Sequence, residues 1–124
     1  MRPKVLLYHL DSDTETGRAL RAVLTGQKIF TLTVREEQVC ETVGRLVATN
    51  AAASGAPALE DAPREAFMLL CSLGDKQLDR LLAAMRLAGV FVPYKAVLTE
   101  HNRDWTFAAL VTEVVREHEA MQNR

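Results

Sequence analysis

The sequence repeats one pattern four times: a short run of apolar, β-branched residues is followed by an amphipathic helical pattern. Strands that alternate with helices favour a mainly parallel sheet with helices packed against it. We therefore expect a single three-layer α/β domain over residues 1–124, built from four strand–helix pairs. Such a fold gathers the strand-to-helix loops at one edge of the sheet, and this edge is where a binding site is expected.

The four expected strands cover residues 5–10, 29–34, 67–73 and 94–99. The first is almost wholly apolar, as in a strand that is covered on both faces. Pro93 lacks an amide donor and Lys95 is charged, so the last strand suits an edge of the sheet. A central first strand gives the order second, first, third, fourth, which is a flavodoxin-like arrangement with one strand fewer and a switch point between the first and third strands.

The segments between the strands predict where the helices begin. Ser12 and Glu15 have the spacing of a capping box, and Asn102 or Asp104 is the expected cap of the last helix. The second strand runs into its helical stripe with almost no loop, which leaves little room for chemistry. Residues 51–63 are rich in alanine and proline and predict a surface loop on the amino edge of the sheet, away from the expected site.

Composition excludes several classes of protein. Fifteen basic and sixteen acidic residues leave a net charge of -1, so the chain lacks the clustered positive surface that nucleic-acid binding needs. The apolar stretch near the N-terminus ends at His9, too early for a signal peptide or a membrane span, and a cytoplasmic location is expected. Cys40 and Cys71 lie on separate elements without partners at metal spacing, so we expect two small buried side chains rather than a zinc site or a disulfide.

No motif of known chemistry is present. The glycines form neither a phosphate-binding loop nor a dinucleotide fingerprint, so no cofactor is expected. A nucleophile elbow and a zinc-binding helix are also absent, so no metal is expected. Asp11 and Asp13 could match the acidic pair of a receiver domain, but Cys71 and Ser72 occupy the place of its phosphate acceptor and a fifth strand is lacking.

Polar residues at the expected carboxyl edge form the candidate site. We expect a small polar pocket for an anionic or polar ligand, supplied by the first and fourth loops and supported by a lysine: His9, Asp11, Ser12, Thr99, His101, Asn102 and Lys95. Lys95 and Thr99 are four apart and would share a face of the strand. The competing interpretation is that Lys95 shields an edge strand, while Thr99 and Asn102 organise a turn.

The last expected strand also carries a resemblance. The segment Val-Pro-Tyr-Lys-Ala-Val-Leu-Thr at residues 92–99, followed by Asn102 and Trp105, resembles an uncharacterised bacterial family of small proteins classed as a domain of unknown function. The resemblance extends over most of the chain, and Lys-Ala-Val-Leu-Thr is its distinctive part. Tyr94 departs from the leucine expected there. The family implies a small stand-alone α/β protein without an established activity.

Two classes of function remain. The first is a non-catalytic cytoplasmic binding or regulatory module for a small ligand or a protein partner, with homodimerisation through an edge strand or a helix face as an option. Nucleic acid and membrane are not expected partners. The alternative is a small enzyme that uses His9 or His101 with Asp11 as an acid–base pair. That alternative requires the side chains to meet across two loops.

Overall fold

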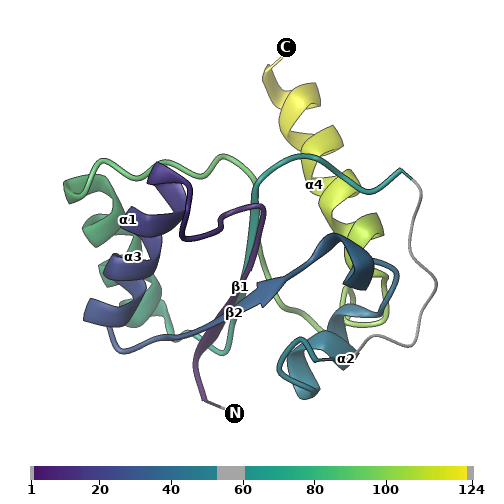
Figure 1. The fold of residues 1–124 in the computed structure, drawn as a ribbon, viewed down its shortest axis with the longest axis horizontal. Coiled ribbons are helices and arrows are strands. Elements are labelled where there is room, and N and C mark those ends of the chain that lie inside the picture. The colour runs from purple at the N-terminus through teal and green to yellow at the C-terminus, as the bar shows by residue number, and fades with distance from the viewer. Residues whose placement is uncertain (1, 53–60, 123–124) are drawn as a thin grey trace.

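A computed structural model describes residues 2–52 and 61–122 and shows a four-stranded sheet between two layers of helices (Figure 1). The strands are β1 (Lys4–Tyr8), β2 (Phe30–Val34), β3 (Phe67–Cys71) and β4 (Lys95–Val97). The helices are α1 (Glu15–Gly26), α2 (Val43–Ala48), α3 (Asp75–Leu87) and α4 (Phe107–Gln122). The strand order is β2-β1-β3-β4, so the predicted order is confirmed, with β4 at an edge.

The sheet is mixed. β1 pairs with β2 and β3 pairs with β4 in parallel, but the central strands β1 and β3 are antiparallel, with Leu6 opposite Leu69. A sheet with mainly parallel pairs is therefore correct, whereas the expectation that all strand-to-helix loops gather at one edge is wrong. The flavodoxin-like arrangement is not confirmed, because a switch point needs parallel neighbours and β1 and β3 run in opposite directions.

The connection between α2 and β3 explains the antiparallel pair. It delivers the chain beside the carboxyl end of β1, where Phe67 is opposite Tyr8 and the Tyr8 hydroxyl donates a hydrogen bond to the Pro63 carbonyl (2.5 Å). The strand that starts there must run back along β1. The end of the predicted loop 51–63 therefore lies on the edge where the site was expected, not on the opposite edge; residues 53–60 of this loop lie outside the described part.

Two hydrophobic cores occupy the two faces of the sheet. Leu6 and Tyr8 point toward α2 and α4, while Val5 and Leu7 point toward α1 and α3; the two pairs of helices stand on opposite sides of the strands in Figure 1. Side chains alternate along a strand, so a central strand must be apolar at successive positions to fill both cores. The predicted covering of the first strand on both faces is confirmed.

Lys4 is a buried charge at the start of β1 that the sequence analysis did not single out. Only 7% of the residue is exposed, and its Nζ donates to the Val47 carbonyl (3.1 Å) and to Asn50 Oδ1 (3.0 Å). Val47 lies in the last turn of α2, where carbonyl groups lack partners within the helix and favour a positive charge. Lys4 therefore fastens the end of α2 to the sheet.

Threonines begin three of the helices. Thr14 caps α1 by accepting from the Gly17 amide (3.0 Å), so the predicted capping box of Ser12 is wrong and Ser12 is exposed. Thr106 accepts from the Ala109 amide (3.1 Å) at the start of α4, so neither Asn102 nor Asp104 is the cap of this helix. Thr42 caps α2, which follows a short 3-10 helix, η1 (Glu36–Gln38), rather than a direct turn from β2.

The two halves of the described chain share one order of elements. The unit β1–α1–β2–α2 repeats as β3–α3–β4–α4, and a pseudo-twofold axis relates the two at the Leu6–Leu69 pair. Thr42 and Thr106 form an antiparallel bridge with each other. The first two backbone amides of α2 donate to carbonyl groups that precede α4: Val43 to Trp105 (2.8 Å) and Gly44 to Arg103 (2.7 Å). The first two amides of α4 donate in turn to carbonyl groups that precede α2: Phe107 to Glu41 (2.9 Å) and Ala108 to Val39 (2.9 Å).

The first helix of each unit ends in the same way. The Ile29 amide donates to Leu24 after α1, and the Val90 amide donates to Met85 after α3, both at 2.9 Å. The residues before these amides, Lys28 (φ 59°) and Gly89 (φ 72°), share a left-handed backbone. His9 (φ 55°) and Ser72 (φ 61°), which follow β1 and β3, share it as well. The repeat therefore includes the turns that follow the first strand and the first helix of each unit.

Two glycines of α1 test how the first unit is packed. A Cβ at Gly17 would lie 2.1 Å from the Asp11 carbonyl oxygen, whereas a Cβ at Gly26 would meet no atom within 4 Å. We expect Gly17→Ala to lower the free energy of unfolding by about 2 kcal/mol, because main chain must move. Gly26→Ala should raise it by about 0.5 kcal/mol, because alanine restricts the unfolded chain.

Urea unfolding followed by circular dichroism measures both changes in the glycine variants. Equal effects of the two substitutions would contradict the close approach of the start of α1 to the loop after β1.

Candidate functional site

The antiparallel pair divides the predicted site between two edges of the sheet. His9, Asp11 and Ser12 follow β1 and lie at the edge where β1 and β2 end. Thr99, His101 and Asn102 follow β4 and lie at the opposite edge, because β4 runs parallel to β3 and β3 runs against β1. A single pocket built from both loops is therefore wrong, since its two halves are separated by the length of the strands.

Thr99 and Asn102 form a closed turn after β4. The Thr99 amide donates to Asn102 Oδ1 (2.9 Å), and the Asn102 amide donates to Thr99 Oγ1 (3.1 Å). Asn102 Nδ2 also donates to the Val97 carbonyl (3.0 Å), and the residue is 8% exposed. These contacts agree with the interpretation that Thr99 and Asn102 organise a turn.

The remaining predicted residues of this edge lie apart from each other. His101 is exposed and its ring meets Trp105 edge-to-face at 5.3 Å. Lys95 lies beside α3 and donates from Nζ to the Val92 carbonyl (3.0 Å). Thr99 lines hollows beside α2 and α4, on the other side of the sheet, so the predicted shared face is wrong. β4 ends at Val97, and side-chain alternation does not continue into the turn.

A polar hollow of about 280 Å³ lies where the parallel strands β1 and β2 end. This is the place at which open α/β sheets bind ligands. The sequence predicted little room there, but the short 3-10 helix η1 turns the chain aside after β2 and leaves a concave surface. Ser12 is not among the residues that line it: Tyr8, His9, Asp11, Val34, Arg35, Glu36 and Glu37.

His9 is the most unusual residue of this hollow. Its backbone is left-handed (φ 55°), a conformation that costs energy for a residue with a side chain and that occurs often at functional sites. Its Nε2 lies 3.1 Å from Glu36 Oε1, and this nitrogen is buried without a well-oriented hydrogen bond in the described structure. The ring also rests against Tyr8, with 4.2 Å between centroids. His9 is therefore held between a ring and a carboxylate.

The hollow is predominantly acidic. Asp11, Glu36 and Glu37 contribute three carboxylates, whereas Arg35 already pairs with Glu37 through Nε (2.7 Å). Hydrogen bonds from the Glu37 backbone and from Arg35 lower the pKa of Glu37. The carboxylates of Asp11 and Glu36 therefore set the sign of the field, which favours a positively charged group.

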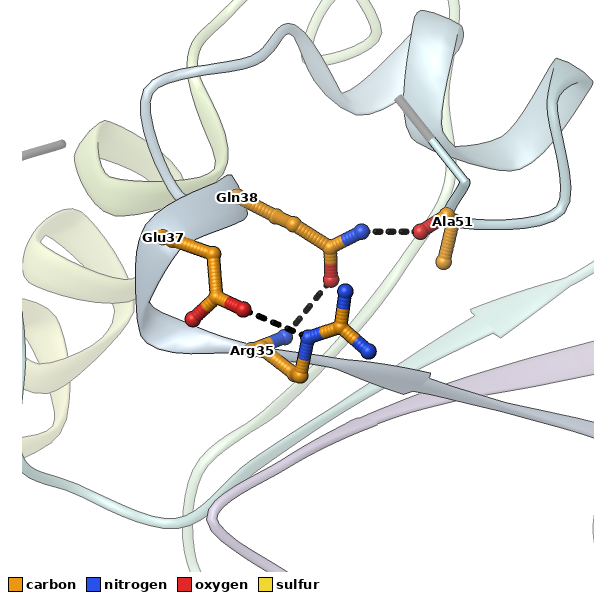
Figure 2. A network of polar contacts seen from close by, with 4 residues as sticks. All are labelled: Arg35, Glu37, Gln38 and Ala51. Atoms are coloured by element: carbon orange, nitrogen blue, oxygen red, sulfur yellow. Dashed lines mark hydrogen bonds and ion pairs between the residues drawn. The ribbon is translucent and has the colours of Figure 1, made fainter. Parts of the chain in front are cut away.

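Gln38 fixes the wall of the hollow and was missed by the sequence analysis. It is 1% exposed; its Oε1 accepts from the Arg35 amide (2.8 Å), and its Nε2 donates to the Ala51 carbonyl (Figure 2). Asn102 accepts from the Thr99 amide at the equivalent place in the second unit. In both units a side-chain amide accepts from the backbone amide three residues earlier, shortly after the strand ends, and this spacing is the signal that could have identified Gln38.

Tyr8 lines the hollow with a buried side chain. Burial raises the pKa of its hydroxyl to about 12, and the nearby carboxylates of Glu36 and Glu65 act in the same direction. The hydroxyl therefore keeps its proton at neutral pH and donates it to the Pro63 carbonyl. Tyr8 is a structural donor rather than a general base.

Metal ligands are not clustered in this structure. Across residues 2–52 and 61–122, we find no group of three or more His, Cys, Asp or Glu side chains arranged to hold a metal ion. Within the same ranges, no helix has the length and apolarity that spanning a membrane requires.

The fold and its hollow define a mixed α/β protein made of two equivalent βαβα units. Residues 66–121 match the model of a family described as a domain of unknown function (DUF3783), which confirms the resemblance to an uncharacterised family of small domains. No match was found among curated proteins or among solved structures. The matched residues run from the start of β3 to the end of α4, so the family domain corresponds to the second unit.

The two cysteines differ in exposure. Cys71 is fully buried beside Lys4 in the sheet, and burial raises the pKa of its thiol to about 12, although the Lys4 charge acts in the opposite direction. Cys40 is half-buried, so the predicted burial of both cysteines is correct only for Cys71.

The raised pKa of Cys71 makes stability depend on alkaline pH. Above the unfolded value of about 9, the unfolded state loses the thiol proton that the folded state retains up to about 12. The free energy of unfolding should therefore fall as pH rises from about 9, by at most about 1.4 kcal/mol per pH unit from this group. Cys71→Ala should remove the part of this pH dependence that comes from the thiol. The part that comes from Tyr8, which begins near pH 10, should remain.

Urea unfolding at a series of pH values measures this dependence. Tyr8→Phe is the matched variant that removes the contribution of the Tyr8 hydroxyl. An unchanged slope between pH 9 and 10 in Cys71→Ala would contradict the assignment.

Proposed function

We propose that this protein is a non-catalytic binding module whose site is the hollow at the carboxyl edge of β1 and β2. The observation that carries the proposal is His9, with a left-handed backbone and a buried Nε2 that faces the Glu36 carboxylate within a concave surface. All the lining residues belong to one unit of one chain. The lining of the site therefore needs no second copy of the chain.

The charge of the hollow indicates the class of ligand. Asp11 and Glu36 supply negative charge, and the described contacts of the hollow give neither carboxylate a lysine or arginine partner. A small polar molecule with a primary amine or a guanidinium group complements this surface, and an anion does not. Of the two ligand types expected from the sequence, the proposal keeps the polar one and replaces the anionic one by a cationic one.

Several of the other polar residues near the strand ends have structural roles. Thr99 and Asn102 satisfy each other and the main chain, and Thr14 caps α1. A histidine–carboxylate contact at 3.1 Å favours one alternative, a small enzyme in which Glu36 and His9 act as an acid–base pair. Asp11 lines the same hollow, whereas His101 lies at the opposite edge and has no place in that pair.

The bacterial source, the cytoplasmic location and homodimerisation stay predictions from the sequence, and none of them is required by the hollow. Sedimentation of the purified chain measures its oligomeric state directly.

Thermal-shift titrations with ethanolamine, putrescine and free arginine, each compared with phosphate and citrate, test the proposed ligand class. At a hundred times its dissociation constant a bound ligand stabilises the folded state by about 2.7 kcal/mol, so we expect a rise in Tm with the cations and none with the anions. Glu36→Gln should abolish the rise, because it removes the facing charge. His9→Asn should weaken it, because asparagine tolerates the left-handed backbone but lacks the ring.

Glu100→Gln is the matched control for this experiment, since Glu100 follows β4 as Glu36 follows β2. The control should leave the shift unchanged. Three results would overturn the proposal: a rise in Tm with the anions, no rise in Tm with any of the cations, or a rise in Tm that persists in Glu36→Gln. Turnover of an amine substrate that is lost in His9→Asn would favour the enzyme instead.

A further inference from the structure

The repeat allows the two outer strands of the sheet, β2 and β4, to be compared at equivalent positions. Arg21 lies three residues before the helix-end acceptor Leu24, and Leu82 lies three residues before the equivalent acceptor Met85. Thr33 is opposite Leu7 in the sheet, and Val97 is opposite the equivalent Leu70. Leu82 and Val97 therefore stand in the second unit where Arg21 and Thr33 stand in the first.

Arg21 closes the edge of the first unit. Its Nη2 donates to Thr33 Oγ1 (2.9 Å) and its Nε donates to the Leu10 carbonyl (3.0 Å), so the side chain bridges α1 to the end of β2. Phe30, at the start of this strand, is covered in part by the Arg2 guanidinium, which lies 4.6 Å from the ring centroid. Polar and cationic side chains thus cover part of the surface beside β2.

The equivalent edge of the second unit is open and apolar. Two hollows of about 320 and 180 Å³ share Leu82 and Lys95 and form one groove between α3 and β4. Val97 is 49% exposed at one end of the groove, and Phe91 is 75% exposed at the other. Exposed apolar side chains that line one groove indicate an interaction surface.

The backbone of β4 adds hydrogen-bonding groups to this groove. The Met68 amide donates to Tyr94 and the Leu98 amide donates to Leu70, so these positions of the β4 segment face β3. The N–H and C=O groups of Lys95 and Val97 alternate with them and face the open edge. Asn102 covers the Val97 carbonyl. Lys95 therefore offers both of its main-chain groups to a strand added alongside.

The charges of the groove define the partner. Arg86 and Lys95 line it, and its other lining residues include no carboxylate: Leu70, Leu78, Leu82, Met85, Val90, Phe91, Val92, Ala96 and Val97. An extended peptide in which acidic and apolar residues alternate would place apolar side chains in the groove and carboxylates near the two cations. We propose that the groove between α3 and β4 binds such an acidic–apolar segment of a partner protein as a fifth strand beside Lys95.

The first unit supplies the variant that tests the docking surface. Leu82→Arg combined with Val97→Thr transfers the Arg21–Thr33 bridge to the second unit and should close the groove. Fluorescence anisotropy with a library of short peptides that alternate Val, Ile, Leu or Phe with Asp or Glu measures binding to the full chain. We expect binding to wild type and about a tenfold or greater loss in the double variant, although the new arginine adds positive charge.

Two further variants separate shape from charge. Arg86→Glu combined with Lys95→Glu should weaken the acidic peptides and favour a matched library with Lys in the acidic positions. Arg21→Leu combined with Thr33→Val opens the β2 edge and should leave the affinity for acidic peptides at β4 unchanged. In NMR spectra of wild type, the acidic peptides should shift the amide signals of Lys95 and Val97 and leave those of Thr31 and Thr33 unmoved.

Several results would overturn the inference. They are an acidic library with no binder, equal affinity in the double variant, or amide shifts confined to β2. Sedimentation that shows a dimer which Leu82→Arg with Val97→Thr dissociates would assign the groove to a second copy of the chain instead. If circular dichroism shows that the double variant is unfolded, Val97→Arg at the exposed strand position provides the same test.

Discussion

The antiparallel pairing of β1 with β3 is the constraint on which the rest of the structure depends. It places Leu6 opposite Leu69 and relates the two βαβα units by a pseudo-twofold axis. Each unit alone would leave one side of its first strand without a partner, and the pairing covers both strands at once. The same pairing sends the carboxyl ends of the two units to opposite edges, so the molecule has two separate places for polar loops.

The second helices lock this pairing on one face of the sheet. The first amides of α2 and α4 donate to carbonyls that precede the other helix, so two helix starts that would otherwise need water satisfy each other. Glu41, which is 6% exposed, lies between β2 and α2 and approaches Arg45 (3.6 Å). A negative charge is favourable near helix N-termini, which explains why an acidic residue is tolerated at this buried place.

The family model matches the second unit, and several turns of the first unit repeat those of the second. Lys28 and Gly89 share a left-handed backbone, and Gln38 and Asn102 accept from equivalent amides. Different side chains thus satisfy the same main-chain requirement, which is why the repeat is visible in hydrogen bonds and weak in residue identity. The sequence predicts four strand–helix pairs but does not group them into two units, because apolar periodicity is alike in all four.

The sequence by itself determined which segments become strands and helices and indicated the edge position of β4, because apolar periodicity, Pro93 and Lys95 act locally. The strand order followed from the sequence only on the assumption that the first strand is central. The sequence also indicated that Thr99 and Asn102 organise a turn. Tertiary structure decided the direction of β3, because that depends on where the connection after α2 delivers the chain. The parallel pairing of β1 with β2 brings His9 to Glu36 in one hollow, and the direction of β3 places His101 at the opposite edge of the sheet.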